Sequence, residues 1–477
     1  MILGHKSTLF LAYAYQFDPG GEALFARTVD GSAAGGTSQT PRVDGSAATG
    51  SKGDWKKHAI KGTALLPHLD EYVRKDELLR AFDVAADLRA AFGAKLAWTF
   101  EGDDGKIDVT ITDPPRLYVL DTHYAFIVIG VTPHLADEAD ITLAKLEDAA
   151  YSIVRAGTSR VAKVPAQMDK WLAAHGLESE EPVPLRRWLA RLVLGLRPDA
   201  PRGTPRTTAP ALFSVVLARE VLSREDQHRL RLVHRANQVV EPEAERDDAI
   251  WSVSSRELCM FSTFGFSWVV TDSASSQFLA DAPHLIRDRY IYKWLLVEHQ
   301  RLCLLALATE CADMSKGLDQ SNFAQMRMRL LEFIATYNFR HISNEERHDR
   351  FYKRVRDSLS IDDLLAEVRD EVVEIDTQLA ARRAETLNHV LAFLTLVLTP
   401  VGIMCSVFQT DTLPGPFRFE KVASLDAWIA LATHGPFIMV LLAAALGATA
   451  YTRLFGAHVV VRLLRTLVLP KKSRNRE

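Results

Sequence analysis

The residues best suited to chemistry lie in a mostly apolar stretch near the end of the sequence. Successive members of this set are three or four residues apart, which places their side chains on one face of an α-helix. They are Asn388, Leu391, Thr395, Thr399, Gly402, Ser406 and Gln409. Hydroxyl and amide oxygens suit a cation that keeps part of its hydration shell, so the set predicts the lining of an ion path when several copies of the helix face one another.

A polar end follows this face at Gln409, Thr410 and Asp411. A ring of Asp411 carboxylates, one from each copy, would attract and hold cations at an outer mouth. The alternative is helix packing, in which Thr395, Thr399 and Ser406 hydrogen-bond to their own helix or to a neighbour and Gly402 allows close approach.

The surrounding sequence predicts two transmembrane helices. No Asp, Glu, Lys or Arg occurs between Glu385 and Asp411, or between Asp426 and Arg453. Each gap exceeds the roughly 20 residues that a spanning helix needs. We expect a two-helix membrane domain at 387–456 with an outer loop at about 410–426; a pair of buried core helices is the alternative.

Basic residues flank the two predicted spans on one side. Arg382 and Arg383 precede the first span, and the tail 457–477 is rich in Arg and Lys. Because basic residues favour the cytoplasmic side, both termini should be cytoplasmic in a multi-pass protein of the inner (plasma) membrane.

A long helix leads into the first span. Apolar residues from Ile361 to Leu379 follow a heptad pattern, and no break signal precedes the span. One helix is therefore expected from about Ile361 to about Phe408, roughly 70 Å long. Its outer faces are acidic, which predicts either a solvated surface or a divalent-cation site between copies. The acidic candidates for that site are Asp363, Glu367, Asp370 and Glu374.

The rest of the sequence divides into a helical stalk at 284–386 and a mixed domain at 1–283. Strand and helix patterns in the mixed domain follow no strict alternation, so we expect an α/β or α+β cytoplasmic domain. A Gly-, Ser- and Ala-rich insertion at about 19–53 cannot bury a core and is predicted to be disordered. No nucleophile elbow, Gly-rich cofactor motif or HExxH occurs, so no enzyme is predicted.

Composition excludes several other classes of function. The net charge of -3 gives no bias toward nucleic acid. The four cysteines lack metal-ligand spacing, and His341 and His348 are interpreted as ordinary surface histidines. No covalently bound cofactor is expected.

The order of these elements resembles the CorA-like magnesium transporter superfamily. The resemblance is clearest from about His284 onward, and Pro400 matches a proline of the family's first span. The family's Gly-Met-Asn signature is replaced here by Gln409, Thr410 and Asp411. The resemblance implies a homopentameric funnel in which the first span lines a central pore and the second packs outside it.

Two functions are therefore expected from the sequence. The first is a membrane channel or transporter for magnesium or another divalent cation, gated by the cytoplasmic domain. The alternative is a CorA-like effector that permeabilises the membrane when a cytoplasmic ligand or partner opens it. The ligand itself is not identified by the sequence.

Overall fold

The structure is a computed structural model of the chain. It describes residues 7–16, 55–58, 60, 65–74, 79–84, 86–93, 97–102, 105–120, 124–134, 142–154, 160–174, 183–194, 206–207, 210–232, 249–271, 276–316, 320–408, 442, 445 and 449. The chain divides into two compact units: Met1–Glu310 with Gln325–Val368, and Cys311–Ala324 with Arg369–Glu477.

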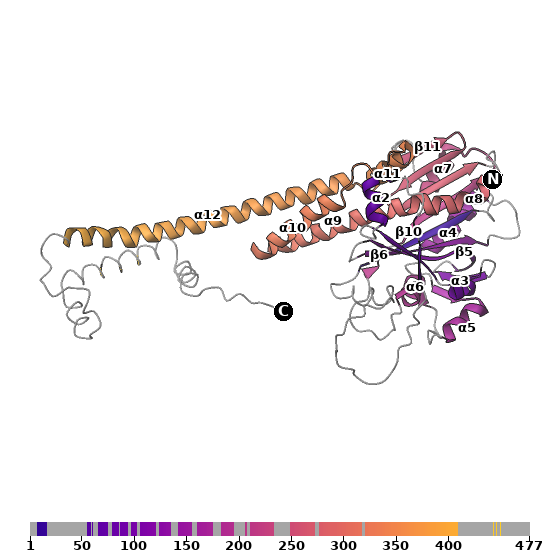
Figure 1. Cartoon of the computed structure of the whole chain (residues 1–477), viewed down its shortest axis with the longest axis horizontal. Helices are drawn as coiled ribbons and strands as arrows, with labels where there is room; N and C mark the ends of the chain where they lie inside the picture. The colour runs from indigo at the N-terminus through magenta and orange to yellow at the C-terminus, as the bar shows by residue number, and fades with distance from the viewer. Residues whose placement is uncertain are drawn as a thin grey trace. The chain divides into compact units, whose positions relative to one another are not determined.

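A large mixed β-sheet forms the centre of the first unit (Figure 1). Within the described residues its main path is β11-β12-β13-β10-β1-β6-β5-β4-β7-β8, with β2, β3 and β9 paired beside it. Only β10 and β13 pair in parallel; the other described pairs are antiparallel. The strands are β1 (Thr8–Gln16), β2 (Trp55–His58), β3 (Arg80–Val84), β4 (Ala97–Gly102), β5 (Gly105–Leu120), β6 (Tyr124–Pro133), β7 (Arg160–Lys163), β8 (Val183–Pro184), β9 (Arg206–Thr207), β10 (Ala211–Ala218), β11 (Ile250–Ser254), β12 (Glu257–Ser262) and β13 (Gly265–Thr271).

Helices cover one face of this sheet. Alternate β1 residues, Leu9, Leu11, Tyr13 and Tyr15, belong to a core shared with α3 to α7. This follows from the strand period of two, which sends every second side chain to the same face. The helices on this face are α3 (Ala86–Phe92), α4 (Leu143–Val154), α5 (Ala166–Ala174), α6 (Leu185–Leu194) and α7 (Arg224–Arg231). The helix α2 (Pro67–Arg74) is not part of this core, and the Leu66 N–H just before it donates a hydrogen bond to the Ile342 carbonyl oxygen.

The opposite face of the sheet packs against later helices through aromatic rings. Phe213 of β10 lies 4.9 Å from Trp294, and Trp268 of β13 lies 4.6 Å from Tyr290, measured between ring centroids. Phe351 contacts Phe261 and Phe266 in the same layer. The elements here are α8 (Ser276–Ile286), the π-helix η4 (Arg287–Ile291), α9 (Tyr292–Lys316), α10 (Gln320–Thr336) and α11 (Glu346–Ser358).

The last long element is α12 (Ile361–Phe408), drawn as one continuous helix in Figure 1. Its bounds are those that the sequence predicts. In the second unit, Cys311, Phe323, Val372, Ile375 and Leu379 are buried. The heptad residues of α12 therefore serve as an internal packing face of the chain.

The predicted fold class was wrong in its membrane part. Within the described residues, no helix is both long enough and apolar enough to cross a bilayer. Many of the side chains between Phe393 and Phe408, on which the first predicted span depended, lie outside what the structure describes. The described residues therefore contain a large mixed sheet with helices, as expected for an α/β or α+β domain, but no two-helix membrane region.

The same finding corrects the expected location. The membrane, transmembrane-helix and channel descriptions, and the multi-pass inner-membrane localisation, depended on two spans that the described helices do not provide. Most of the second predicted span, the outer loop and the basic tail lie outside the described residues, as does the predicted insertion at 19–53.

Candidate functional site

The predicted ion-path residues lie on an exposed side of α12. Asn388, Leu391, Thr395, Thr399 and Gly402 are all exposed in the single chain. Ser406 lies in α12 but its side chain is outside what the structure describes, and Gln409, Thr410 and Asp411 lie beyond the described part of the helix. The predicted outer mouth is therefore untested.

One member of this set supports the alternative interpretation. The Thr395 hydroxyl donates a 2.8 Å hydrogen bond to the Leu391 carbonyl oxygen in its own helix. The Thr386 hydroxyl likewise donates a 2.8 Å hydrogen bond to the Arg382 carbonyl oxygen. These hydroxyls are satisfied by the backbone, as expected for a threonine on a helix surface.

The acidic candidates are also exposed. Asp363, Glu367, Asp370 and Glu374 point away from the buried face of α12. Among the described residues, no three His, Cys, Asp or Glu side chains lie close enough together to hold a metal ion. The predicted cation site uses more than one copy of the chain, so a single chain does not test it.

The side chains along α12 form two rows that differ in exposure to solvent. Two heptad rows run along the helix on nearly opposite sides. The inner stripe is buried in the chain and consists of Ile361, Leu365, Val368, Val372, Ile375 and Leu379. The outer stripe is exposed and consists of Val373, Thr377, Ala380, Ala384, Leu387, Leu391 and Leu394.

Among the side chains of α12 that the structure describes, the outer stripe holds the largest exposed apolar ones. Val373 is 64% exposed, Leu387 62% and Leu391 59%. Single exposed apolar residues are ordinary, but a row at heptad spacing is the pattern by which helices pair. The outer stripe is therefore the candidate interaction site.

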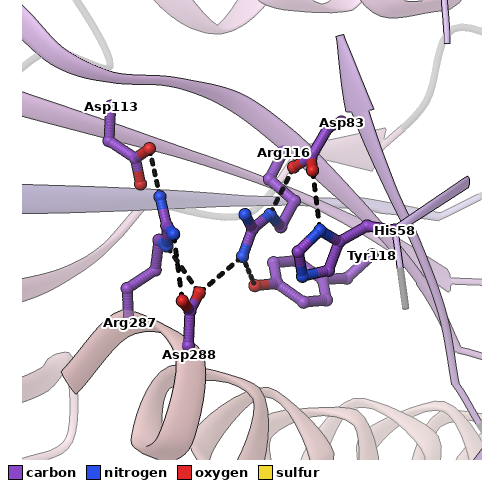
Figure 2. A network of polar contacts seen from close by, with 7 residues as sticks. All are labelled: His58, Asp83, Asp113, Arg116, Tyr118, Arg287 and Asp288. Carbon is purple, nitrogen blue, oxygen red and sulfur yellow. Dashed lines mark hydrogen bonds and ion pairs between the residues drawn. The ribbon is translucent and has the colours of Figure 1, made fainter. Parts of the chain in front are cut away.

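Sequence reasoning missed a network of charged side chains at one side of the sheet. Figure 2 shows Arg287 between Asp113 and Asp288, and Arg116 between Asp288 and Asp83. His58 completes the network at Asp83, and Arg116 also donates to the Tyr118 hydroxyl. We call these residues the polar network: His58, Asp83, Asp113, Arg116, Tyr118, Arg287 and Asp288.

The polar network joins elements that are far apart in the sequence. Arg116 Nε lies 2.6 Å from Asp83 on β3, and its Nη1 lies 2.7 Å from Asp288 on η4, 172 positions away. Arg287 Nε lies 2.7 Å from Asp288, and Arg287 also pairs with Asp113 on β5. The network therefore holds η4, at the start of α9, against strands β3 and β5.

Local sequence explains how Asp113 and Arg116 reach the same network. Residues three apart in a regular strand point to opposite faces. Here the pairing with β6 shifts register between Asp113 and Arg116, across two prolines that cannot donate a ladder hydrogen bond. Opposite Asp113, a Cβ on Gly130 would approach the Asp113 Cβ to 2.6 Å, so glycine makes room for this arrangement.

Electrostatics keep the network charged. Burial alone would raise the pKa of Asp83, but the His58 hydrogen bond and the Arg116 charge outweigh it and hold the pKa below its usual range. Burial likewise opposes the Asp288 charge, and Arg287 and Arg116 lower its pKa. The chemistry available here is structural ion pairing, because each arginine is already engaged by carboxylates.

The interpretation of both histidines as surface residues fits His341 and was wrong for His348. The side chain of His341 is 62% exposed and pairs with Asp349, as a surface histidine can. His348 is buried and its Nδ1 lies 2.9 Å from Lys293 Nζ. Its place on the buried face of an amphipathic α11, beside Phe351 and Tyr352, was the available sequence signal.

Comparisons with protein-family models, curated proteins and solved structures gave no match to this chain. The CorA-like resemblance, ion transport and the homopentamer therefore remain predictions from the sequence.

Proposed function

We propose that the protein is a homo-oligomeric assembly protein in which the outer stripe of α12 joins one copy to the next. The mixed-sheet units are thereby tethered to a shared helical bundle. Five copies is the number that the family resemblance implies. Ion transport is not part of the proposal, because it was predicted together with the membrane spans.

The observation that supports the proposal is the exposed heptad row itself. Burying a leucine or valine side chain contributes roughly 1.5 to 3 kcal/mol relative to leaving it in water. Val373, Leu387, Leu391 and Leu394 are all exposed, and the inner stripe already serves packing within the chain. A second helix along the outer stripe would recover this free energy.

The distribution of residues along the outer stripe favours another copy of the same helix. After Val373 its first part is small or polar, and its last part is leucine. When two copies lie parallel and in register, Leu387, Leu391 and Leu394 meet their own counterparts. An antiparallel pairing over the whole stripe would instead place Leu387 against Ala380 and Leu394 against Val373, so that the leucines would not meet one another.

Charges beside the stripe fit the same arrangement. In heptad terms Leu387 is at position d and Leu391 at position a, which places Arg369 at g and Glu374 at e. In a parallel pair, a g residue faces the e residue five positions later in the other helix. Arg369 of one copy therefore faces Glu374 of the next with opposite charge.

Molar mass in solution tests the proposal. We expect the natural chain to run as a multiple of its 53.2 kDa mass in light scattering after size exclusion. The double variant Leu387→Asp, Leu391→Asp should run as a single chain, because it places four or more like charges in the bundle core.

The control also introduces two aspartates, elsewhere on the same helix, and changes the net charge by three rather than two. Arg382 and Thr386 are exposed on the other side of α12, so Arg382→Asp, Thr386→Asp should keep the natural mass. The proposal fails if the natural chain is a single copy at every concentration tested, or if the stripe variant assembles as well as the control.

A further inference from the structure

A buried lysine at the junction of α9 and α11 has contacts that the proposed assembly does not explain. Lys293, in the first turn of α9, is 0% exposed. Its Nζ donates a 2.9 Å hydrogen bond to the Arg289 carbonyl oxygen and lies 2.9 Å from His348 Nδ1. The rings of Tyr290 and Tyr292 lie 5.5 and 5.0 Å from the same nitrogen, measured to their centroids.

His348 links Lys293 to a carboxylate at the surface of the protein. His348 Nε2 lies 3.4 Å from the carboxylate of Glu345, whose side chain is 66% exposed. Burial, and then the charges of Lys293, Arg347 and Arg289, lower the pKa of His348 to about 3, so the ring is neutral at physiological pH. With Nδ1 accepting from the lysine, the ring proton lies on Nε2 and faces Glu345.

We propose that Lys293, His348 and Glu345 form a proton-controlled latch that holds α11 against α9 and is released more readily when Lys293 is charged. An ammonium group without water is costly, and one neutral imidazole, one carbonyl oxygen and two ring faces compensate only in part. When α11 separates, the ammonium regains its hydration. Once Lys293 has lost its proton, opening no longer gains this free energy of hydration.

The direction of the pH effect follows from proton binding in the two states. Burial lowers the pKa of Lys293 to about 7; Arg289 adds to this and Glu345 opposes it. A lysine in water titrates near 10.4, so the open state binds more protons above pH 7. The latch is therefore weakest at and below pH 7 and tightens as pH rises above it.

Neighbouring charged groups act in other pH windows. The groups around the latch are Arg289 and Tyr290 on η4, Tyr292 on α9, Glu345, Arg347 and His348 at α11, and Asp70 on α2, which acts on Tyr292. Burial raises the pKa of Glu298 on α9 to about 7. Its titration therefore changes the opening constant mainly below pH 7, whereas titration of Lys293 changes it above pH 7. Burial also raises the pKa of the Cys259 thiol, which acts above about pH 8.5. The window from pH 7 to 8.5 therefore isolates Lys293.

Amide hydrogen exchange across α11 measures the opening directly. After correction for the chemical exchange rate, we expect the opening constant of Glu346–Ser358 to fall roughly fifteenfold between pH 7 and 8.5. Lys293→Met should abolish this dependence. Lys353→Met, at an exposed lysine of α11, should preserve it.

Two results would overturn the latch. One is a pH-independent opening constant in the natural chain over this window, and the other is an unchanged dependence in Lys293→Met. If Lys293→Met does not fold, lysine ε-carbon NMR of the natural chain decides: one resonance should titrate near pH 7, and titration of every lysine near 10.4 contradicts the proposal.

Discussion

Arg116 is the residue on which the polar network most depends. Its side chain is 8% exposed and contacts Asp83, Asp288 and Tyr118 from one guanidinium group. A lysine could not reproduce this, because only the planar guanidinium presents donors in several fixed directions. Buried arginine pairs are strongly sensitive to loss of one partner, since the carboxylates stay behind without a counter-charge.

We therefore predict that Arg116→Met lowers the free energy of unfolding by about 2 to 3 kcal/mol. The effect is below that of a fully buried pair because Asp83 and Asp288 keep partial contact with water. Urea denaturation measures it. The control is Arg329→Met, which removes an exposed pair with Glu310 and should change stability by about 1 kcal/mol or less. Equal losses in the two variants would contradict the role given to the network.

Acid should weaken the same network. The pKa values of Asp83 and Asp288 are lower in the folded chain than the usual 3.9 or so of an unfolded aspartate. The stabilisation is therefore complete above about pH 4 and is lost as pH falls toward the lower folded values. Urea midpoints recorded from pH 5 to 2.5 should fall, and the fall should be smaller in Asp83→Asn. A variant that falls as steeply as the natural chain would count against this assignment.

At the scale of elements, the junction between α11 and α12 has an unusual backbone. Ser360 has a φ of 49°, in the left-handed region that residues with a Cβ avoid. The residue separates the end of α11 from Ile361, which is buried at the start of α12. Glycine has no Cβ to strain in this conformation.

Ser360→Gly should therefore raise the free energy of unfolding by about 1 kcal/mol. Ser358→Gly, two residues earlier and inside α11, should lower it by about 0.5 to 1 kcal/mol because glycine loses more backbone freedom in a helix. Thermal or urea unfolding of both variants checks the contrast. A destabilised Ser360→Gly would show that the serine side chain, not the backbone angle, matters at this position.

Elements with a strong local pattern could be predicted from the sequence. The continuous apolar run at Ala211–Ala218 forms β10, the turn signal near Gly105 lies between β4 and β5, and α12 has the predicted bounds. These signals come from neighbours in the sequence. The membrane assignment depended on two spans that the helices of the described residues do not provide.

The residues of the candidate sites were harder to predict from the sequence than the helices and strands. The face of α12 predicted from the sequence shares only Leu391 with the outer stripe, and exposure was needed to separate the outer stripe from the inner one. The polar network depends on a register shift at Asp113 and on contacts between β5 and η4, which no local pattern contains. His348 was assigned to the surface because its partner, Lys293, lies 55 positions away.

At the scale of the whole molecule, self-association through α12 is the central claim. The outer stripe is exposed over about six turns, its leucines are at one end, and Arg369 and Glu374 have opposite charges at the other. The position of the leucines and the opposite charges both favour two parallel copies in register over a pairing that reverses one helix.

Cysteine cross-linking at position 391 tests this claim most directly. In a parallel bundle in register, Leu391→Cys places the same thiol of two copies within disulfide reach. We predict rapid formation of a covalent two-chain species under mild oxidation, well above that of the natural chain with its own cysteines, and none for Gln378→Cys, an exposed position beside the stripe. No cross-link at position 391 beyond the natural level would contradict the account.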